Sequence, residues 1–358
     1  MRNKEYKPDY AVHPGVTLKE MLIAYNMKQI DLSKRIGITE KHISNIINQE
    51  SPITSETALR LEKVFGVSSE FWNNYQKMYD DTLARIRDEE RIIDDINELP
   101  KLKIAYNNLA KMNYVKQTRQ NNEKVAELRS FFGVSSLKKI NQVYELLFRK
   151  SSKEADQYSV TAWLRIGEKE LYNKNIQEFN RVLLRDQIKN IRKLTVLNEK
   201  EFIPKLKEML FDAGLLFLYL PYFKNSYING VARWIDKKPI IQISSRNKYQ
   251  DIFWFSLFHE IAHILNHKKS DIFIEYDRKV GISAEEIEAD QFAQNTLIRL
   301  NLYKLFVKKS NFSDFNIAEF AKDISIDKGI VAGRLANDGY IAYSKIAHLR
   351  RKFYENTI

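Results

Sequence analysis

The stretch FWFSLFHEIAHILNHKK, residues 253–269, places three histidines and one glutamate in a long apolar run without glycine or proline. The absence of helix breakers predicts one continuous helix. Such an apolar helix packs into a core, where an ionisable group is costly unless it is paired or binds a metal ion. The fold must therefore bury this helix and give its polar side chains partners.

Two of the histidines, His259 and His263, have the spacing of metal ligands. They are four residues apart, so both imidazoles lie on one side of the helix about one turn apart. This spacing lets two nitrogen atoms bind one zinc ion, while Glu260 is rotated away and can act as general base toward a water molecule. The alternative interpretation is an ordinary core helix with two unrelated histidines.

A third ligand is expected from the next helical segment, ISAEEIEADQFAQNTLI, residues 282–298. Glu286 and Asp290 share one face of this segment, so one can bind zinc while the other accepts a hydrogen bond from a ligand imidazole. Glu288 lies on the other side and is the second choice as ligand. His267 does not have the spacing of a third histidine ligand, so it is expected to pack or hydrogen-bond nearby.

With the preceding run PIIQISS, residues 239–245, these two segments resemble the ImmA/IrrE family of zinc metallopeptidases over about residues 214–300. The resemblance implies a zincin-like domain in which His259, His263 and Glu286 bind Zn2+ and Glu260 is the catalytic base. Asp290 is then the carboxylate that holds a ligand imidazole. Because family members often cleave or inactivate a repressor, the resemblance implies a zinc-dependent endopeptidase that cleaves a specific regulatory protein, either a repressor or a toxin–antitoxin partner.

The N-terminal string QIDLSKRIGITEKHISNIIN, residues 29–48, predicts two short helices joined by a turn at Gly37, as in a helix-turn-helix. The second helix of that motif enters the major groove by its N-terminal end. Asn and Ser can read base edges there, whereas Lys and Thr suit phosphates. The residues expected to contact DNA are Gln29, Thr39, Lys41, His42, Ser44 and Asn45. A module for protein contacts alone is the alternative, and near-neutral charge favours that alternative.

The wider string from His13 to Asp80, with the runs HPG, ITSETALRL and SSEFWNNYQ, resembles the Xre/HigA-type helix-turn-helix family. This resemblance implies operator DNA binding as a homodimer in transcription control. A second hypothesis follows from it: the chain is a HigA-type antitoxin or repressor whose zincin-like domain is a non-catalytic sensor or scaffold.

The composition restricts the chemistry and the location of the chain. Its 358 residues include no cysteine, so a metal must be held by His, Asp or Glu. The polar N-terminus lacks a signal segment, and no apolar run reaches the roughly 20 residues of a membrane span. A soluble cytoplasmic protein without membrane contact is expected. The net charge is +12, and residues 101–200 hold 21 basic and 10 acidic residues. This basic surplus either forms a solvated surface or binds a nucleic acid or an acidic partner.

Four segments are expected along the chain. Residues 1–80 form an all-α helix-turn-helix domain, and 81–200 form a helical connector and a basic helical segment. Residues 201–310 form the zincin-like domain, where short β-rich runs at 214–244 predict a small sheet. Residues 311–358 form a helical tail that packs on that domain. The expected fold class is mainly α with a small β-sheet (α+β).

Overall fold

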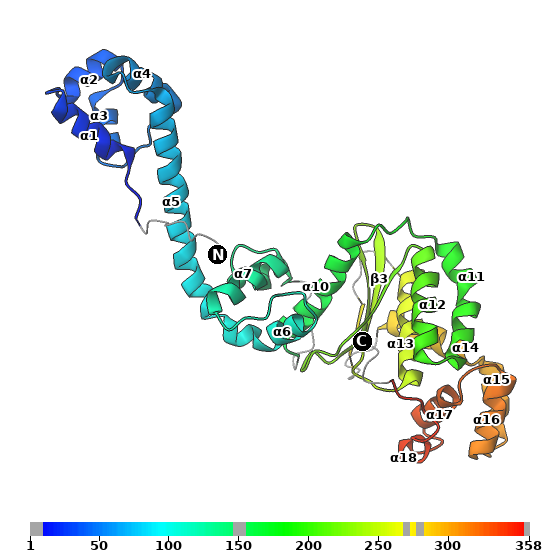
Figure 1. Ribbon diagram of the computed structural model, residues 1–358. Coiled ribbons are helices and arrows are strands. Elements are labelled where there is room, and N and C mark those ends of the chain that lie inside the picture. Colours follow the sequence, from blue (N-terminus) through cyan, green and yellow to red (C-terminus); the bar gives the residue numbers. More distant parts are fainter. Residues whose placement is uncertain (1–9, 146–154, 268–272, 277–282, 354–358) are drawn as a thin grey trace. The chain divides into compact units, whose positions relative to one another are not determined.

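The computed structural model describes residues 10–145, 155–267, 273–276 and 283–353 (Figure 1). The chain divides into two compact units, Met1–Glu98 and Leu99–Ile358. The described part of the first unit is helical, whereas the second combines helices with one sheet, which confirms the expected mainly α fold with a small β-sheet. Among the described residues, no helix is long and apolar enough to cross a membrane.

The first unit is built from short helices that begin and end at residues suited to those positions. Gly37 ends α2 in the left-handed conformation, with φ of 66°, and Thr39 caps the start of α3. Leu32, Ile43 and Trp72 are fully or almost fully buried in the shared core. The helices are α1 (Pro14–Ala24), α2 (Gln29–Ile36), α3 (Glu40–Ile47), α4 (Ser55–Phe65) and α5 (Ser69–Ile96).

The second unit begins with helices that precede the sheet. Pro100 lies at the second position of α6, where the missing N–H costs no hydrogen bond. The helices are α6 (Leu99–Lys111), α7 (Asn121–Phe132), α8 (Ile140–Val143), α10 (Gln157–Asn173), α11 (Arg181–Lys193) and α12 (Glu199–Asp212). The division between the units thus falls inside the segment 81–200, and α6, α7 and α10 belong to the same unit as the sheet.

The sheet has the strand order β1-β3-β2-β4, with β1 parallel to β3 and the other neighbouring pairs antiparallel. The strands are β1 (Leu216–Leu220), β2 (Ile228–Ile235), β3 (Lys238–Ser244) and β4 (Phe273–Tyr276). Figure 1 shows α10 on one side of β3 and α12 with α13 (Gln250–Asn266) on the other. Since both faces are covered, β1 and β3 are almost wholly buried.

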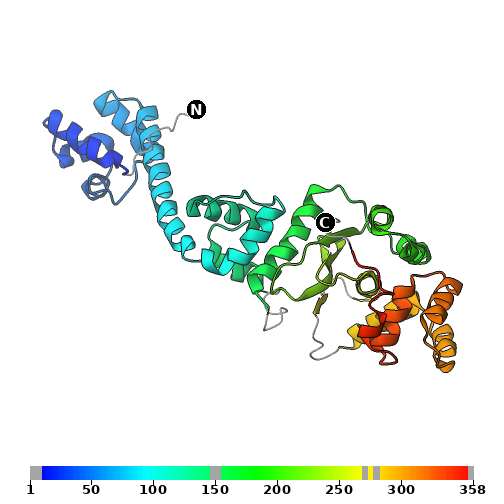
Figure 2. The same cartoon turned by 60° about the horizontal axis from the view of Figure 1, so that its bottom comes forward.

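Helix α13 lies at the centre of this unit, as the apolar run predicts. Trp254, Leu257, Phe258 and Ile261 have no exposed surface. This helix packs against β2, β3, α14 and α17, so its ionisable residues lie deep in the unit. The later helices are α14 (Ala284–Leu297), α15 (Leu300–Lys308), α16 (Asp314–Asp323), α17 (Lys328–Asn337) and α18 (Tyr343–Ile346). Figure 2 shows α15 to α18, coloured orange to red, together at one end of the unit.

Candidate functional site

Helices α13 and α14 bring three candidate metal ligands to one point. The Nε2 atoms of His259 and His263 are 3.0 Å apart. The Glu286 carboxylate lies 3.2 Å from His259 Nε2 through one oxygen and 3.6 Å from His263 Nε2 through the other. Candidate ligand atoms of all three residues lie within 4.8 Å of one another. The histidine side chains are 3% and 1% exposed and Glu286 is 32% exposed, so the cluster opens outward at the glutamate.

The other ring nitrogens of the two histidines face hydrogen-bond partners. His259 Nδ1 lies 3.0 Å from Asp290 Oδ1, and His263 Nδ1 lies 2.8 Å from His267 Nδ1. When Nε2 keeps its electron pair for a cation, the proton is on Nδ1. His259 then donates to Asp290, and His263 donates to His267. The contacts therefore favour the tautomers that leave both Nε2 atoms available.

His267 can accept that hydrogen bond because of its own neighbour. Acceptance at Nδ1 requires the His267 proton to lie on Nε2, and this atom is 3.4 Å from Glu288 Oε2. Glu288, 56% exposed, is thus placed at His267, while Glu286 is placed with the two central histidines. Glu286 rather than Glu288 therefore lies with His259 and His263, and His267 lies nearby as a hydrogen-bond partner.

Burial keeps His263 in the form that binds a cation. Desolvation lowers the pKa of His263 to about 2, and repulsion from His259 and His267 acts in the same direction. The imidazole is therefore neutral near pH 7. A neutral imidazole is the form that a metal ion requires, so proton competition at this ligand is small.

Glu260 lies on a different side of α13 from the histidine pair, against strand β2. Its side chain is fully buried, and a Cβ atom added at Gly230 would lie 2.6 Å from Glu260 Oε1. A side chain at position 230 would displace the carboxylate, so the glycine leaves room for Glu260 to pack directly against β2. Gly230 was not among the residues expected at the site, although a glycine at the start of GVARWI, residues 230–235 within the β-rich stretch 214–244, was the available signal.

A cavity of about 390 Å³ lies beside the histidine cluster. Asp290, which contacts His259, and Phe255, whose ring centroid is 6.3 Å from that of His259, are among its lining residues. Arg334 of α17 lines the cavity too, and its Nε donates to Asp338 Oδ2 at 2.7 Å. The centre therefore adjoins a space large enough for part of a polypeptide.

In the first unit, the residues expected at DNA lie at the start of α2 and along α3. Lys41 is exposed, and Gln29, His42, Ser44 and Asn45 are partly exposed. The Thr39 hydroxyl accepts a hydrogen bond from His42 N at 3.3 Å, so this side chain caps α3. The helix end therefore presents one cation and several hydrogen-bonding groups.

Comparisons with known proteins match each unit to a family. Residues 18–72 match the family described as helix-turn-helix, and residues 213–335 match the IrrE N-terminal-like domain. Virulence-associated protein I of Dichelobacter nodosus is 35% identical over 75 residues, which are 21% of this chain and 69% of that protein. An uncharacterized HTH-type transcriptional regulator of Haemophilus influenzae is 39% identical over 17% of this chain and 58% of its own length.

One solved structure is similar to part of the chain. An addiction module antidote protein of the HigA family from Coxiella burnetii is 35% identical, over 24% of this chain and 94% of that one, with a TM-score of 0.22. The family matches confirm both resemblances. The chain belongs to the helix-turn-helix family through its N-terminal unit. Its C-terminal unit carries an IrrE N-terminal-like domain.

Proposed function

We propose that the chain is a transcriptional regulator that binds operator DNA and carries a zinc-dependent endopeptidase for one regulatory protein. The observation that supports the peptidase most is the convergence of His259, His263 and Glu286 at one point, with the buried Glu260 next to His259 in the same helix. The family match of residues 213–335 supports the same proposal. The protein acts within the cytoplasm as a homodimer on its operator, and its substrate is a repressor or a toxin–antitoxin partner.

The donor set fits zinc. Two neutral imidazoles and one carboxylate are a ligand set found in catalytic zinc sites, which leave one position open. His259 and His263 would bind through Nε2, and Glu286 through its carboxylate. When bound, zinc supplies polarisation of a peptide carbonyl and favours deprotonation of a water molecule. Asp290 and His267 hold the two imidazole rings in place.

Glu260 is the residue that moves the proton. Its carboxylate takes a proton from the attacking water and passes it to the leaving nitrogen of the peptide bond. Gly230 and the surrounding core hold the carboxylate in position and limit access of bulk water. The adjoining cavity is expected to hold the part of the substrate chain that flanks the scissile bond.

A second candidate function is a HigA-type antitoxin or repressor in which the metal centre is a sensor or scaffold. The complete burial of Glu260 favours it, because a general base must reach the water that it activates. The test is incubation of the purified zinc-loaded chain with the repressor or toxin encoded beside its gene. Cleavage by wild type and none by Glu260→Gln supports the peptidase, whereas zinc binding without cleavage supports the sensor.

Replacing His267 with alanine is expected to weaken zinc binding by about 10–100-fold, as loss of a hydrogen-bond partner to a ligand histidine does. The change removes the acceptor for His263 Nδ1 and keeps the three ligands. Competition with a chromophoric chelator measures the affinity. His348→Ala is the matched control, because His348 is 59% exposed and pairs with Asp314. Equal affinities for the two variants would contradict this role of His267.

Replacing Asn45 with alanine is expected to weaken operator binding by about 1–3 kcal/mol, the usual value of one good base contact. Binding to random duplex should change little, since an amide contributes little to phosphate neutralisation. Lys41→Ala is the contrasting variant, because an exposed cation contacts phosphate and its loss weakens both kinds of binding equally. Anisotropy titrations with both duplexes measure the difference. An equal loss on operator and random DNA for Asn45→Ala would contradict base reading.

A further inference from the structure

Helix α11 carries a row of four cations on one exposed face: Arg181, Arg185, Lys189 and Lys193. We call these four residues the basic row. Each is four positions from the next, so they lie along one side of the helix at steps of about 6 Å and span about 18 Å. Figure 1 shows α11 on the side of α12 that faces away from β3. The row therefore points outward from the unit.

The opposite side of α11 is fixed to the unit, so the orientation of the basic row is set by packing. Leu184 and Ile191 are fully buried. Arg192 donates to the carbonyl oxygens of Leu297 at 3.0 Å and Ile324 at 2.8 Å. These contacts reach the last turn of α14 and the end of α16. The helix cannot turn its cations inward without breaking these hydrogen bonds and exposing Leu184 and Ile191.

The arrangement of the basic row is unfavourable for the helix itself. Like charges at positions i and i+4 destabilise a helix, and the row contains three such successive pairs. Arg181 lies at the first position, where the helix dipole disfavours a cation. Among the parts of the chain that the structure describes, none of the four cations forms an ion pair. Asp186, also exposed, is the acidic residue of this helix and lies three positions before Lys189, so one carboxylate faces four cations and the row keeps a net positive charge.

A further cation lies near the end of the row. Burial lowers the pKa of Arg192, and repulsion from Arg299 lowers it further, which places Arg299 close to the last turn of α11. Arg299 is exposed. The row gathers four of the 21 basic residues of segment 101–200 on one helix, and Arg299 adds a cation near the last turn of that helix.

We propose that the basic row binds the sugar–phosphate backbone of duplex DNA. Duplex DNA carries one phosphate per about 1.7 Å of its axis, so an 18 Å row of cations always faces several of them. The exposed face of α11 has no aromatic side chain, so it offers no stacking platform for single strands and no aromatic anchor for a protein. The contact is therefore electrostatic and independent of sequence. It does not depend on the proposed zinc chemistry.

The test uses the full chain with all four residues of the row replaced by glutamine. Glutamine keeps the helix propensity of lysine and arginine, so the fold is retained and the melting temperature is unchanged or higher. Affinity for a 30-base-pair random duplex is measured by anisotropy between 50 and 200 mM salt. The plot of log affinity against log salt is expected to become shallower by about 0.9 per lost phosphate contact, up to about 3.6.

The matched control removes the same charge from other exposed positions of this unit. Lys304, Lys308, Lys309 and Lys322 are all exposed, and their replacement by glutamine should leave the slope nearly unchanged. An unchanged slope in the row variant, or an equal loss in the control, would overturn the inference. The inference would also be overturned if the row variant bound duplex DNA as the wild type does but bound poly-glutamate more weakly, since the row would then bind an acidic protein.

A second comparison separates the basic row from the helix-turn-helix. In a chain with Lys41→Ala and Asn45→Ala, the recognition helix contributes less to DNA binding. The row variant made in this background is expected to lose the same increment of slope as in the wild type. If the increment disappears in this background, the row has no DNA contact of its own and the inference is wrong.

Discussion

The Glu260→Gln chain is expected to bind zinc as the wild type does and to cleave its protein substrate about 10²–10⁴-fold more slowly. Glutamine has nearly the same shape, so it fits the space beside Gly230. It cannot accept the proton of the attacking water, whereas the three expected ligands are unchanged. Zinc content is measured in the purified protein, and cleavage is followed by mass spectrometry of the substrate.

Two further variants make this result specific. Glu285→Gln changes an exposed glutamate next to the proposed ligand Glu286 and is expected to leave zinc content and cleavage unchanged. His259→Ala removes a ligand and is expected to lose both. Cleavage by Glu260→Gln at the wild-type rate would sink the assignment of Glu260 as the base. If the wild-type chain carries zinc but cleaves neither the repressor nor the toxin encoded beside its gene, the metal centre is better explained as a sensor or scaffold.

The parts of the site that the sequence predicted are those set within one helix. The placement of His259 and His263 on one side of α13 follows from their spacing alone, and the common face of Glu286 and Asp290 follows in the same way. The contact of His267 with Glu288 joins α13 to α14, and spacing within one helix does not reveal it. The packing of the two helices, which places Glu286 with the histidine pair and Glu288 at His267, is likewise not encoded within one helix.

The less predictable features depend on contacts between distant segments. Gly230 faces Glu260 because of how β2 packs on α13, which no local pattern encodes. The expected limit of the first domain at residue 80 follows the end of the family resemblance at Asp80, and α5 continues past that residue to Ile96 because no helix breaker interrupts it. The middle helices were expected as a separate segment, and their packing on the sheet depends on pairs such as Arg233 and Glu168, 65 residues apart.

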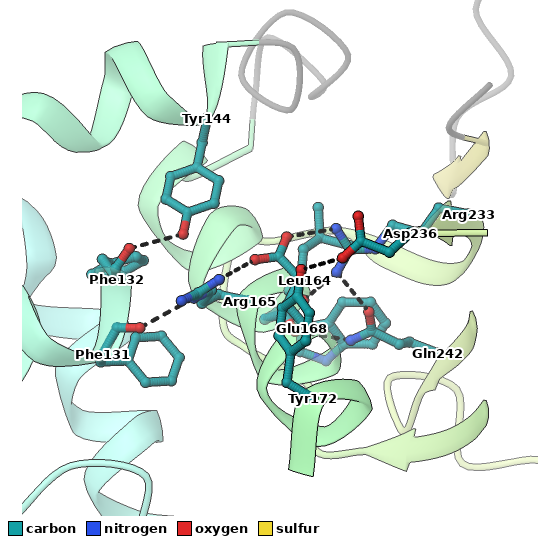
Figure 3. Close-up of polar contacts among 11 residues, drawn as sticks. Phe131, Phe132, Tyr144, Leu164, Arg165, Glu168, Tyr172, Arg233, Asp236 and Gln242 are labelled. Atoms are coloured by element: carbon teal, nitrogen blue, oxygen red, sulfur yellow. Dashed lines mark hydrogen bonds and ion pairs between the residues drawn. The ribbon is translucent and has the colours of Figure 1, made fainter. Parts of the chain in front are cut away.

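The ion pair between Glu168 and Arg233 joins α10 to the sheet (Figure 3). Helix α10 lies on the side of β3 opposite α13 (Figure 1). Arg233 Nη1 lies 3.0 Å from Glu168 Oε1, and its Nη2 donates to the Leu164 carbonyl and to Gln242. Glu168 also pairs with Arg165 at 2.6 Å, and Arg165 donates to the Phe131 carbonyl at the end of α7. The network thus connects α7, α10, β2 and β3.

The two partners of this pair differ in exposure, so the two single variants should differ in stability. Arg233 is 4% exposed and Glu168 is 14% exposed. Glu168→Ala leaves a buried guanidinium without its carboxylate, and the expected loss is about 3–5 kcal/mol in the free energy of unfolding. Arg233→Met removes the buried charge and leaves Glu168 paired with Arg165, so the expected loss is smaller. Urea unfolding of the full chain, followed through the transition of the second unit, measures both.

The double variant Glu168→Ala with Arg233→Met decides whether the loss comes from an unpaired buried charge. It removes both partners, so it is expected to be more stable than Glu168→Ala alone. Glu178→Ala, at an exposed position, should change stability by less than about 0.5 kcal/mol. If the double variant were as unstable as Glu168→Ala, lost packing would explain the effect.

Strand β2 carries both Arg233 and Gly230, so a loosened β2 in Glu168→Ala should displace Glu260 and reduce cleavage. Zinc affinity is set by α13 and α14 and is expected to stay the same.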